Sequence, residues 1–211
     1  MKVLKQILSS KLSQISLWIM MFSSYSLSGH GYVITDKPEN QFDATSAVKW
    51  DYWGTRTLSR LSNKKASAKA VSGDGSITVG VVKDAWSRTY AVKWNYWGTY
   101  ELSTSSWVKK SMATGITSDG SIISGIIKNE SSQNFAVVWK DNKMYVLPSS
   151  WAVESKANGI SADGSVIVGT AKDAWSRTYA VKWDGGEAKV LPRGWAVKSI
   201  ANSVSANGSV M

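Results

Sequence analysis

The sequence predicts an all-β protein that repeats one four-stranded antiparallel unit about four times, and three recurring markers support this. The tetrapeptide Ala-Val-Lys-Trp starts at positions 47, 91 and 180, and its variant Ala-Val-Val-Trp starts at 136. A turn motif, Asp-Gly-Ser, starts at 74, 119 and 163, and Asn-Gly-Ser starts at 207. Single glycines follow the first three turns at 80, 125 and 169. Each marker returns after 44 or 45 residues, which indicates a repeat architecture.

Each unit divides into four short predicted strands, which we label A to D in chain order. In the last complete unit the strands cover 155–161, 165–171, 178–183 and 187–191. A tight turn joins A to B, a longer loop joins B to C, and a glycine-rich turn joins C to D. Asp-Gly and Asn-Gly favour tight turns because glycine, and to a lesser degree asparagine or aspartate, accepts positive φ.

Four antiparallel strands in about 44 residues match the size of a β-propeller blade. Such sheets bury both faces by stacking on their neighbours, whereas the coils of a β-solenoid, the alternative architecture, are usually shorter. The repeats start near a C strand at 47 and end within a B strand at 211. We therefore expect an incomplete or open propeller-like array of about 3.7 repeats over 45–211, with a closed four-blade propeller as the alternative.

The amino-terminal segment differs from the repeats. Lys2, Lys5 and Lys11 form a basic start, an apolar run follows at 15–22, and small residues occupy 26–28. This order is typical of a secretory signal peptide, and an uncleaved amphipathic anchor is the alternative. We predict a signal helix at 1–28, a leader segment at 29–44 and the repeat domain at 45–211.

The composition argues against most catalytic chemistry. The chain has no cysteine and a single histidine, His30, which excludes thiolate catalysis and disfavours a Ser-His-Asp triad. Asp74, Asp119 and Asp163 stand alone in their units, whereas calcium takes about six to eight oxygen ligands, so we predict turn-forming aspartates. We expect no enzymatic activity, no cofactor and no metal. A propeller glycosidase is the enzymatic alternative, although no acids form a recognisable pair.

Tryptophans recur at the ends of the C strands, in the C–D turns at Trp53 and Trp97, and in the B–C and D–A connections. Those that end the C strands, predicted to pack between blades, are Trp50, Trp94, Trp139 and Trp183. If the strands alternate in direction, the B–C and D–A connections share one face of the array. The residues that this face would present as a ligand-binding surface are Trp86, Arg88, Trp107, Trp151, Trp175, Arg177 and Trp195. The alternative is that these tryptophans fold back and cap the blade ends.

The segment 157–169, Ala-Asn-Gly-Ile-Ser-Ala-Asp-Gly-Ser-Val-Ile-Val-Gly, followed by Tyr-Ala-Val-Lys-Trp at 179–183, carries a further signal. Looser copies occur at 113–125 and 69–80. The pattern resembles the HAF family of bacterial extracellular repeats. The resemblance implies an exported protein, because such repeats often form autotransporter passengers ahead of a carboxy-terminal membrane barrel. No strand series of that type is recognisable near position 211, so we expect a piece of a longer passenger or a freely secreted copy.

Together these observations predict an exported, extracellular or outer-membrane-surface repeat protein that acts as a binding or adhesion module. A passive structural spacer is the alternative. The formal net charge of +10 favours anionic partners or simply solubility, and the scattered basic residues form no nucleic-acid-binding motif. The expected partners are a host glycan or protein surface, with no nucleic acid. Membrane contact is expected only through the export signal or a missing barrel, and self-association through open blade edges is a further expectation.

Overall fold

The computed structural model describes residues 32–35, 47–51, 54–58, 65–192 and 194–211, which form four antiparallel sheets. The predicted signal helix at 1–28 lies outside these residues. The first sheet contains β1 (Tyr32–Thr35), β2 (Ala47–Asp51) and β3 (Gly54–Thr57). The second contains β4 (Lys65–Val71), β5 (Thr78–Lys83), β6 (Thr89–Asn95) and β7 (Gly98–Glu101). The third contains β8 (Val108–Ile116), β9 (Ile122–Asn129), β10 (Asn134–Lys140) and β11 (Lys143–Val146). The fourth contains β12 (Glu154–Ile160), β13 (Ile167–Lys172), β14 (Thr178–Trp183) and β15 (Lys189–Val190).

Each four-stranded sheet is one blade, and its strands pair in chain order as A to D. The predicted bounds of the fourth blade hold to within one or two residues at each strand end. Strand C matches β14, whereas strand B starts later than predicted, at Ile167, because Ser165 belongs to the preceding turn. Strand D is shorter than predicted, covering only Lys189–Val190.

The leader segment contributes a strand that the sequence did not reveal. β1 pairs antiparallel with β2 and holds the place that strand B holds in the other blades. Thr35 lies opposite Ala47 as Val81 lies opposite Ala91. The residues before and within β1 lack the Asp-Gly-Ser turn and the glycine that accompany strand B elsewhere, so the repeat period placed the start of the array too late.

The hydrophobic core lies between blades, as propeller stacking requires. Trp139 of β10 is buried in a cluster with Val79 and Leu102 of the second blade. Trp183 of β14 packs in the same way in a cluster with Ala136 of the third blade. The indole Nε1 of Trp139 donates to the carbonyl of Ser103 at 2.7 Å, and that of Trp183 donates to Pro148 at 2.9 Å. The packing role predicted for the strand C tryptophans is therefore confirmed for Trp94, Trp139 and Trp183, and the side chain of Trp50 lies outside the described part.

The glycine that follows each turn sits where strand B approaches a bulge of strand A. Gly169 lies opposite Ala157, and the register of β12 shifts immediately afterwards. A Cβ atom built at Gly169 would lie 1.9 Å from the carbonyl oxygen of Lys156, and one at Gly80 would lie 2.1 Å from that of Ser67. Only glycine permits this close approach of two backbones.

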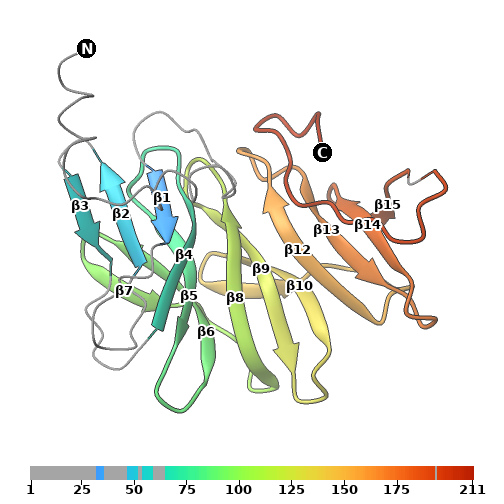
Figure 1. Cartoon of the computed structure of the whole chain (residues 1–211), viewed down its shortest axis with the longest axis horizontal. Helices are drawn as coiled ribbons and strands as arrows, with labels where there is room; N and C mark the ends of the chain where they lie inside the picture. The colour runs from blue at the N-terminus through green and yellow to red at the C-terminus, as the bar shows by residue number, and fades with distance from the viewer. Residues whose placement is uncertain (1–31, 36–46, 52–53, 59–64, 193) are drawn as a thin grey trace, which may run out of the picture.

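The blades lie side by side in an open arc, with β3 near one end and β15 near the other (Figure 1). Backbone hydrogen bonds connect the A–B turns of successive blades, from Gly73 N to Ser118 O at 2.7 Å and from Ser118 N to Ala162 O at 2.8 Å. The carboxy-terminal segment continues this series, because Ala162 N donates to Ala206 O at 2.9 Å. It stacks on the fourth blade and does not complete the first, so the described chain forms the open array and no closed four-blade ring. No helix in the described part of the chain is long and apolar enough to cross a membrane.

Candidate functional site

In each A–B turn the aspartate or asparagine side chain accepts hydrogen bonds from groups of the same turn. Asp163 Oδ1 accepts hydrogen bonds from Ser161 Oγ at 2.6 Å and from the backbone N and the Oγ of Ser165 at 3.0 and 2.8 Å. Asp74 and Asp119 make the same set of contacts, and Asn207 reproduces it with an amide oxygen. The glycine that follows has φ of 71 to 76° in all four turns, a backbone conformation that residues other than glycine rarely adopt.

These hydrogen bonds stabilise the carboxylates in their charged form. The hydroxyl of Ser161, followed by the backbone and hydroxyl of Ser165, lowers the pKa of Asp163 to about 2. The pKa of Asp74 and that of Asp119 fall to about 2 for the same reason. The turn role predicted for the three aspartates is confirmed by these contacts. Among the described residues, no group of three or more His, Cys, Asp or Glu side chains is placed to hold a metal ion.

The B–C loops of the second and fourth blades are organised by a buried aspartate. Asp84 Oδ1 accepts hydrogen bonds from the backbone N of Trp86 at 3.0 Å and of Arg88 at 2.8 Å, and its Oδ2 accepts from Arg88 Nε at 2.6 Å. Asp173 holds Trp175 and Arg177 through the same three contacts. Burial opposes ionisation of Asp84, but the hydrogen bonds and charge of Arg88 hold its pKa below the usual range.

Each of these loops presents an exposed indole with a guanidinium over it. Arg88 Cζ lies 5.1 Å from the ring centroid of Trp86, and Arg177 Cζ lies 5.0 Å from that of Trp175. The two tryptophans are 77% and 76% exposed. We call these two couples the Trp–Arg pairs. A cation held over an aromatic face at such distances is a recognised attractive geometry, and the ion pair to the loop aspartate fixes its position.

The third blade closes the same loop without a Trp–Arg pair. Asn129 takes the place of the aspartate, and its Oδ1 accepts from the backbone N of Gln133 at 2.9 Å. Ser132 has φ of 64°, as Ser176 does in the fourth blade and as Ser87 does, at 63°, in the second. Ser131 and Gln133 stand where the other loops have tryptophan and arginine. The loop conformation therefore does not depend on the exposed indole.

The tryptophans of the D–A connectors behave differently from those of the loops. Trp107 packs edge-to-face on Phe135 of the next blade, with ring centroids 6.1 Å apart, and Trp151 packs on Tyr179 at 5.7 Å. Trp151 Nε1 also donates to the carbonyl of Ala188 at 3.1 Å. These side chains are 41% and 37% exposed. The alternative that tryptophans cap the blade ends thus describes Trp107 and Trp151 in part.

The fourth blade brings both kinds of tryptophan into one continuous surface. Arg177 lies between the rings of Trp175 and Tyr179, 5.8 Å from the latter, and Tyr179 carries Trp151 on its edge. This confirms that a B–C loop and a D–A connector meet on the same side of the array. Sequence reasoning missed Asp173 and Tyr179 as parts of the arrangement, although both fall within the twelve-residue segment repeated identically at 83–94 and 172–183.

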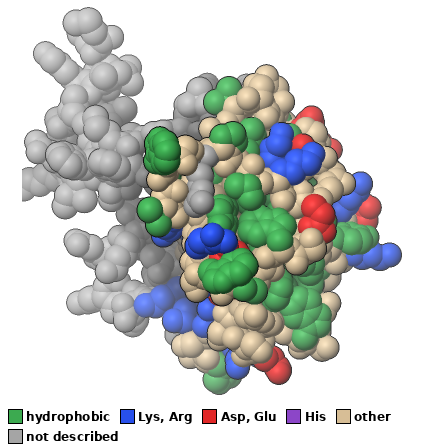
Figure 2. Space-filling view, turned by 90° about the vertical axis from the view of Figure 1, so that its right-hand side faces the viewer, with side chains coloured by type: hydrophobic (Ala, Val, Ile, Leu, Met, Phe, Trp, Pro, Cys, Tyr) green, Lys and Arg blue, Asp and Glu red, His purple; other side chains and the backbone are tan. Residues whose placement is uncertain are grey.

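Trp195 has no ring contact within the described part and is fully exposed. It stands 44 residues after Trp151, and the described chain supplies no further strand C on which it would pack. Figure 2 views the end of the molecule that carries the fourth blade. Hydrophobic side chains form several patches there, interrupted by basic and acidic groups (Figure 2).

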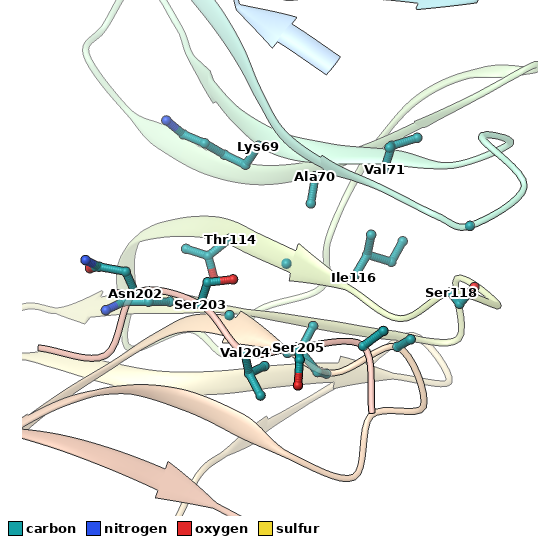
Figure 3. A pocket seen from close by; sticks show the side chains of 17 residues that line it. Lys69, Ala70, Val71, Thr114, Ile116, Ser118, Asn202, Ser203, Val204 and Ser205 are labelled. Atoms are coloured by element: carbon teal, nitrogen blue, oxygen red, sulfur yellow. The ribbon is translucent and has the colours of Figure 1, made fainter. Parts of the chain in front are cut away.

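A concave region, separate from the Trp–Arg pairs, follows the A strands on the inner side of the arc. It encloses about 400 Å³ and is lined mainly by small residues and backbone (Figure 3). The cavity is bordered by one residue from the same position of each successive repeat: Lys69, Thr114, Asn158 and Asn202. Thr114 Oγ1 donates to Ala157 O of the next blade, and Asn158 Nδ2 donates to Ala201 O of the carboxy-terminal segment, each at 2.8 Å. Its lining includes no carboxylate side chain, so this cavity does not offer the paired acids of a glycosidase.

Comparisons with known proteins identify the fold. No family model and no curated protein matches the sequence. A structure of TolB from Agrobacterium tumefaciens superposes with a TM-score of 0.60 and 15% identity, covering 85% of this chain and 68% of that one. TolB from Acinetobacter baumannii gives 0.57 with 13% identity over 80% of this chain, and a chain of the nidogen/laminin complex gives 0.52 with 10% identity over 83%. The protein spans 42% and 65% of those two chains. At these identities the similarity shows the fold alone: the chain is an all-β, β-propeller-type array of four-stranded blades.

Proposed function

We propose that the protein is an exported binding module without catalytic activity, and that its binding face is the rim formed by the B–C loops and D–A connectors. The observation that carries the proposal is the exposure of Trp86 and Trp175, each with an arginine fixed over its ring. The third blade makes the same loop without them. Large aromatic rings that the fold does not need, combined with arginine, are typical of recognition surfaces.

The chemistry of this rim suits a glycan or a protein surface. Indole rings provide flat apolar faces for stacking, and the guanidinium beside each ring provides directional hydrogen-bond donors. The structural spacer is the second reading. A spacer needs the contacts between blades but has no use for exposed indoles, so the Trp–Arg pairs favour binding over the spacer. We infer no role for nucleic acid.

The location outside the cell is part of the proposal. It is supported by the order of basic, apolar and small residues at 1–28 and by the resemblance of the repeats to bacterial extracellular repeats. Intact-mass measurement of the protein recovered from the medium and from the cell surface of its native host tests this. Export predicts a species that lacks about the first 28 residues. A full-length species confined to the cell interior would contradict it.

Binding is tested by screening the full chain on glycan and protein arrays. We expect at least one ligand whose signal falls about tenfold or more in a double Trp86→Ala, Trp175→Ala variant, because each indole supplies a stacking face. Tyr96→Ala, Trp97→Ala is the matched control, since these exposed aromatics lie in a C–D turn, outside the proposed face. Equal loss in both variants, or no ligand on either array, would contradict the assignment.

A further inference from the structure

The junction between the second and third blades contains a cleft of about 370 Å³ beside one of the Trp–Arg pairs. The start of β6, the end of β7 and the start of β8 line it. Arg88, whose guanidinium lies over Trp86, forms part of the wall, together with Lys109, Lys110 and Glu101. We call this cavity the basic cleft. Its volume falls in the range of small-ligand sites.

The basic cleft has an excess of positive charge and one guanidinium that an ion pair holds in place. Three cations and one carboxylate are among its lining side chains. Arg88 donates to Asp84 through Nε, which fixes the guanidinium, and its two terminal nitrogens make no hydrogen bond within the described residues. Lys109 and Lys110 are exposed and make no ion pair within the described residues.

A bulge explains how two consecutive lysines border one cavity. Neighbouring side chains of a regular strand point to opposite faces. The register of β8 against β9 shifts between Val108 and Lys110, so Lys109 is the extra residue of a bulge. Bulges redirect side chains in this way and are frequent next to binding sites. Both ammonium groups can therefore serve the same cleft.

The equivalent junction between the third and fourth blades has the opposite chemistry. Glu154 stands in the place of Lys110, Val153 in that of Lys109, and Gln133 in that of Arg88. Glu154 Oε2 already accepts a hydrogen bond from Asn134 Nδ2 at 2.6 Å. The three cations of the basic cleft are thus not repeated at this next junction.

We infer that the basic cleft binds an anionic sugar unit of an acidic polysaccharide, with its carboxylate or sulfate against Arg88, Lys109 and Lys110 and an adjoining ring on Trp86. This rests on the proposed function and narrows it to a ligand class. The juxtaposition of a flat aromatic face with three cations, one of them fixed by an ion pair, is what such a unit requires, because it carries both an apolar ring face and a full negative charge. The attraction weakens with ionic strength, since the cleft is open to solvent.

The test measures binding of the full chain to immobilised polygalacturonate, which is carboxylated, and to heparin, which is sulfated. Neutral dextran and double-stranded DNA serve as comparison probes. We expect binding to at least one acidic polysaccharide, and an apparent affinity about tenfold weaker or worse in Lys109→Val, Lys110→Glu, which copies the next junction. Lys140→Val, Lys143→Glu makes the same change of charge at a C–D turn and should leave binding nearly unchanged.

Three results would overturn the inference: no binding to either acidic polysaccharide, equal loss in the two double variants, or equal cleft-dependent binding of DNA. The first two mean that any attraction is absent or diffuse, and the third that the cleft does not select sugars. A ligand from the glycan or protein arrays whose binding depends on Trp86 and Trp175 but not on Lys109 and Lys110 would contradict this inference. It would leave the proposed function intact.

Discussion

The A–B turns and the B–C loops are both tight connections held by one carboxylate or amide side chain. They differ in how many of their side chains remain exposed and available to contact a ligand. In each A–B turn the aspartate or asparagine bonds to the two hydroxyl side chains that flank it, and the backbone bonds to the next blade or to the carboxy-terminal segment. In the B–C loops the acceptor and the serine with positive φ are retained in all three complete blades, whereas the outward residues change from Trp–Arg to Ser–Gln. The comparison separates residues that make the fold from residues that are available for binding.

The largest expected effect comes from breaking the part that makes the fold. Gly169→Ala places a Cβ atom 1.9 Å from the carbonyl oxygen of Lys156, so β12 and β13 must separate at the bulge. We expect a loss of about 2–3 kcal/mol in the free energy of unfolding, measured by urea titration. Gly186→Ala is the matched control because no atom lies within 4 Å of its added Cβ. Equal stability of the two variants would refute this account of the repeated glycine.

The acceptor of the B–C loop should matter more than its exposed residues. Asp173→Ala removes the partner of two backbone N–H groups and of Arg177 Nε, and we expect Tm to fall by several degrees. Asp173→Asn should be milder because Asn129 supports the same loop in the third blade. Thermal unfolding followed by circular dichroism compares the two. An alanine variant as stable as the asparagine variant would mean that the loop does not need its acceptor.

Trp151, which precedes the fourth blade, and Trp195, which follows it, separate the contribution of a packed ring from that of an exposed one. Trp151→Ala loses the edge contact with Tyr179 and the hydrogen bond to Ala188, so we expect about 1–2 kcal/mol of destabilisation. Trp195→Ala should change stability by less than about 0.5 kcal/mol, because that ring is fully exposed. The sequence analysis also expects self-association through the open blade edge, where Trp195 is exposed. In that case light scattering should give a lower molar mass for Trp195→Ala than for the original chain, and an unchanged molar mass for Trp151→Ala.

The A–B turns give a pH dependence with a defined sign. In the unfolded chain Asp119 and Asp163 bind protons near their ordinary pKa of 3.8, whereas in the folded chain they do so only near about 2. Their stabilising contribution is therefore complete above about pH 4 and is lost as the pH falls toward 2. Asp119→Asn, Asp163→Asn should flatten Tm against pH in that window, as Asn207 makes the same turn without a titrating group. An unchanged slope would place the acid sensitivity elsewhere.

The repeat period predicted the blades, their strand order and the inward tryptophans because these features recur and depend on local turn chemistry. It failed at β1, where the marker residues are absent and only pairing with β2 defines the strand. Trp86, Trp175 and their arginines were identifiable from their loops. Their anchors Asp84 and Asp173 were not, because the repetition of an aspartate in a loop does not show which groups it bonds. The bulge that brings Lys109 and Lys110 to one cleft is likewise a matter of pairing register, which the sequence does not encode locally.

The most direct test of the central claim gives both Trp–Arg loops the third blade's residues at the acceptor, tryptophan and arginine positions. The substitutions are Asp84→Asn, Trp86→Ser and Arg88→Gln in one loop, and Asp173→Asn, Trp175→Ser and Arg177→Gln in the other. Thermal unfolding and binding to the ligands found on the arrays are measured on the same preparation. The account predicts a Tm within about 2 °C of the original chain, together with loss of most ligand binding. Binding retained at full strength, or a large fall in Tm, would contradict it, since the exposed pairs would then be dispensable for recognition or required for folding.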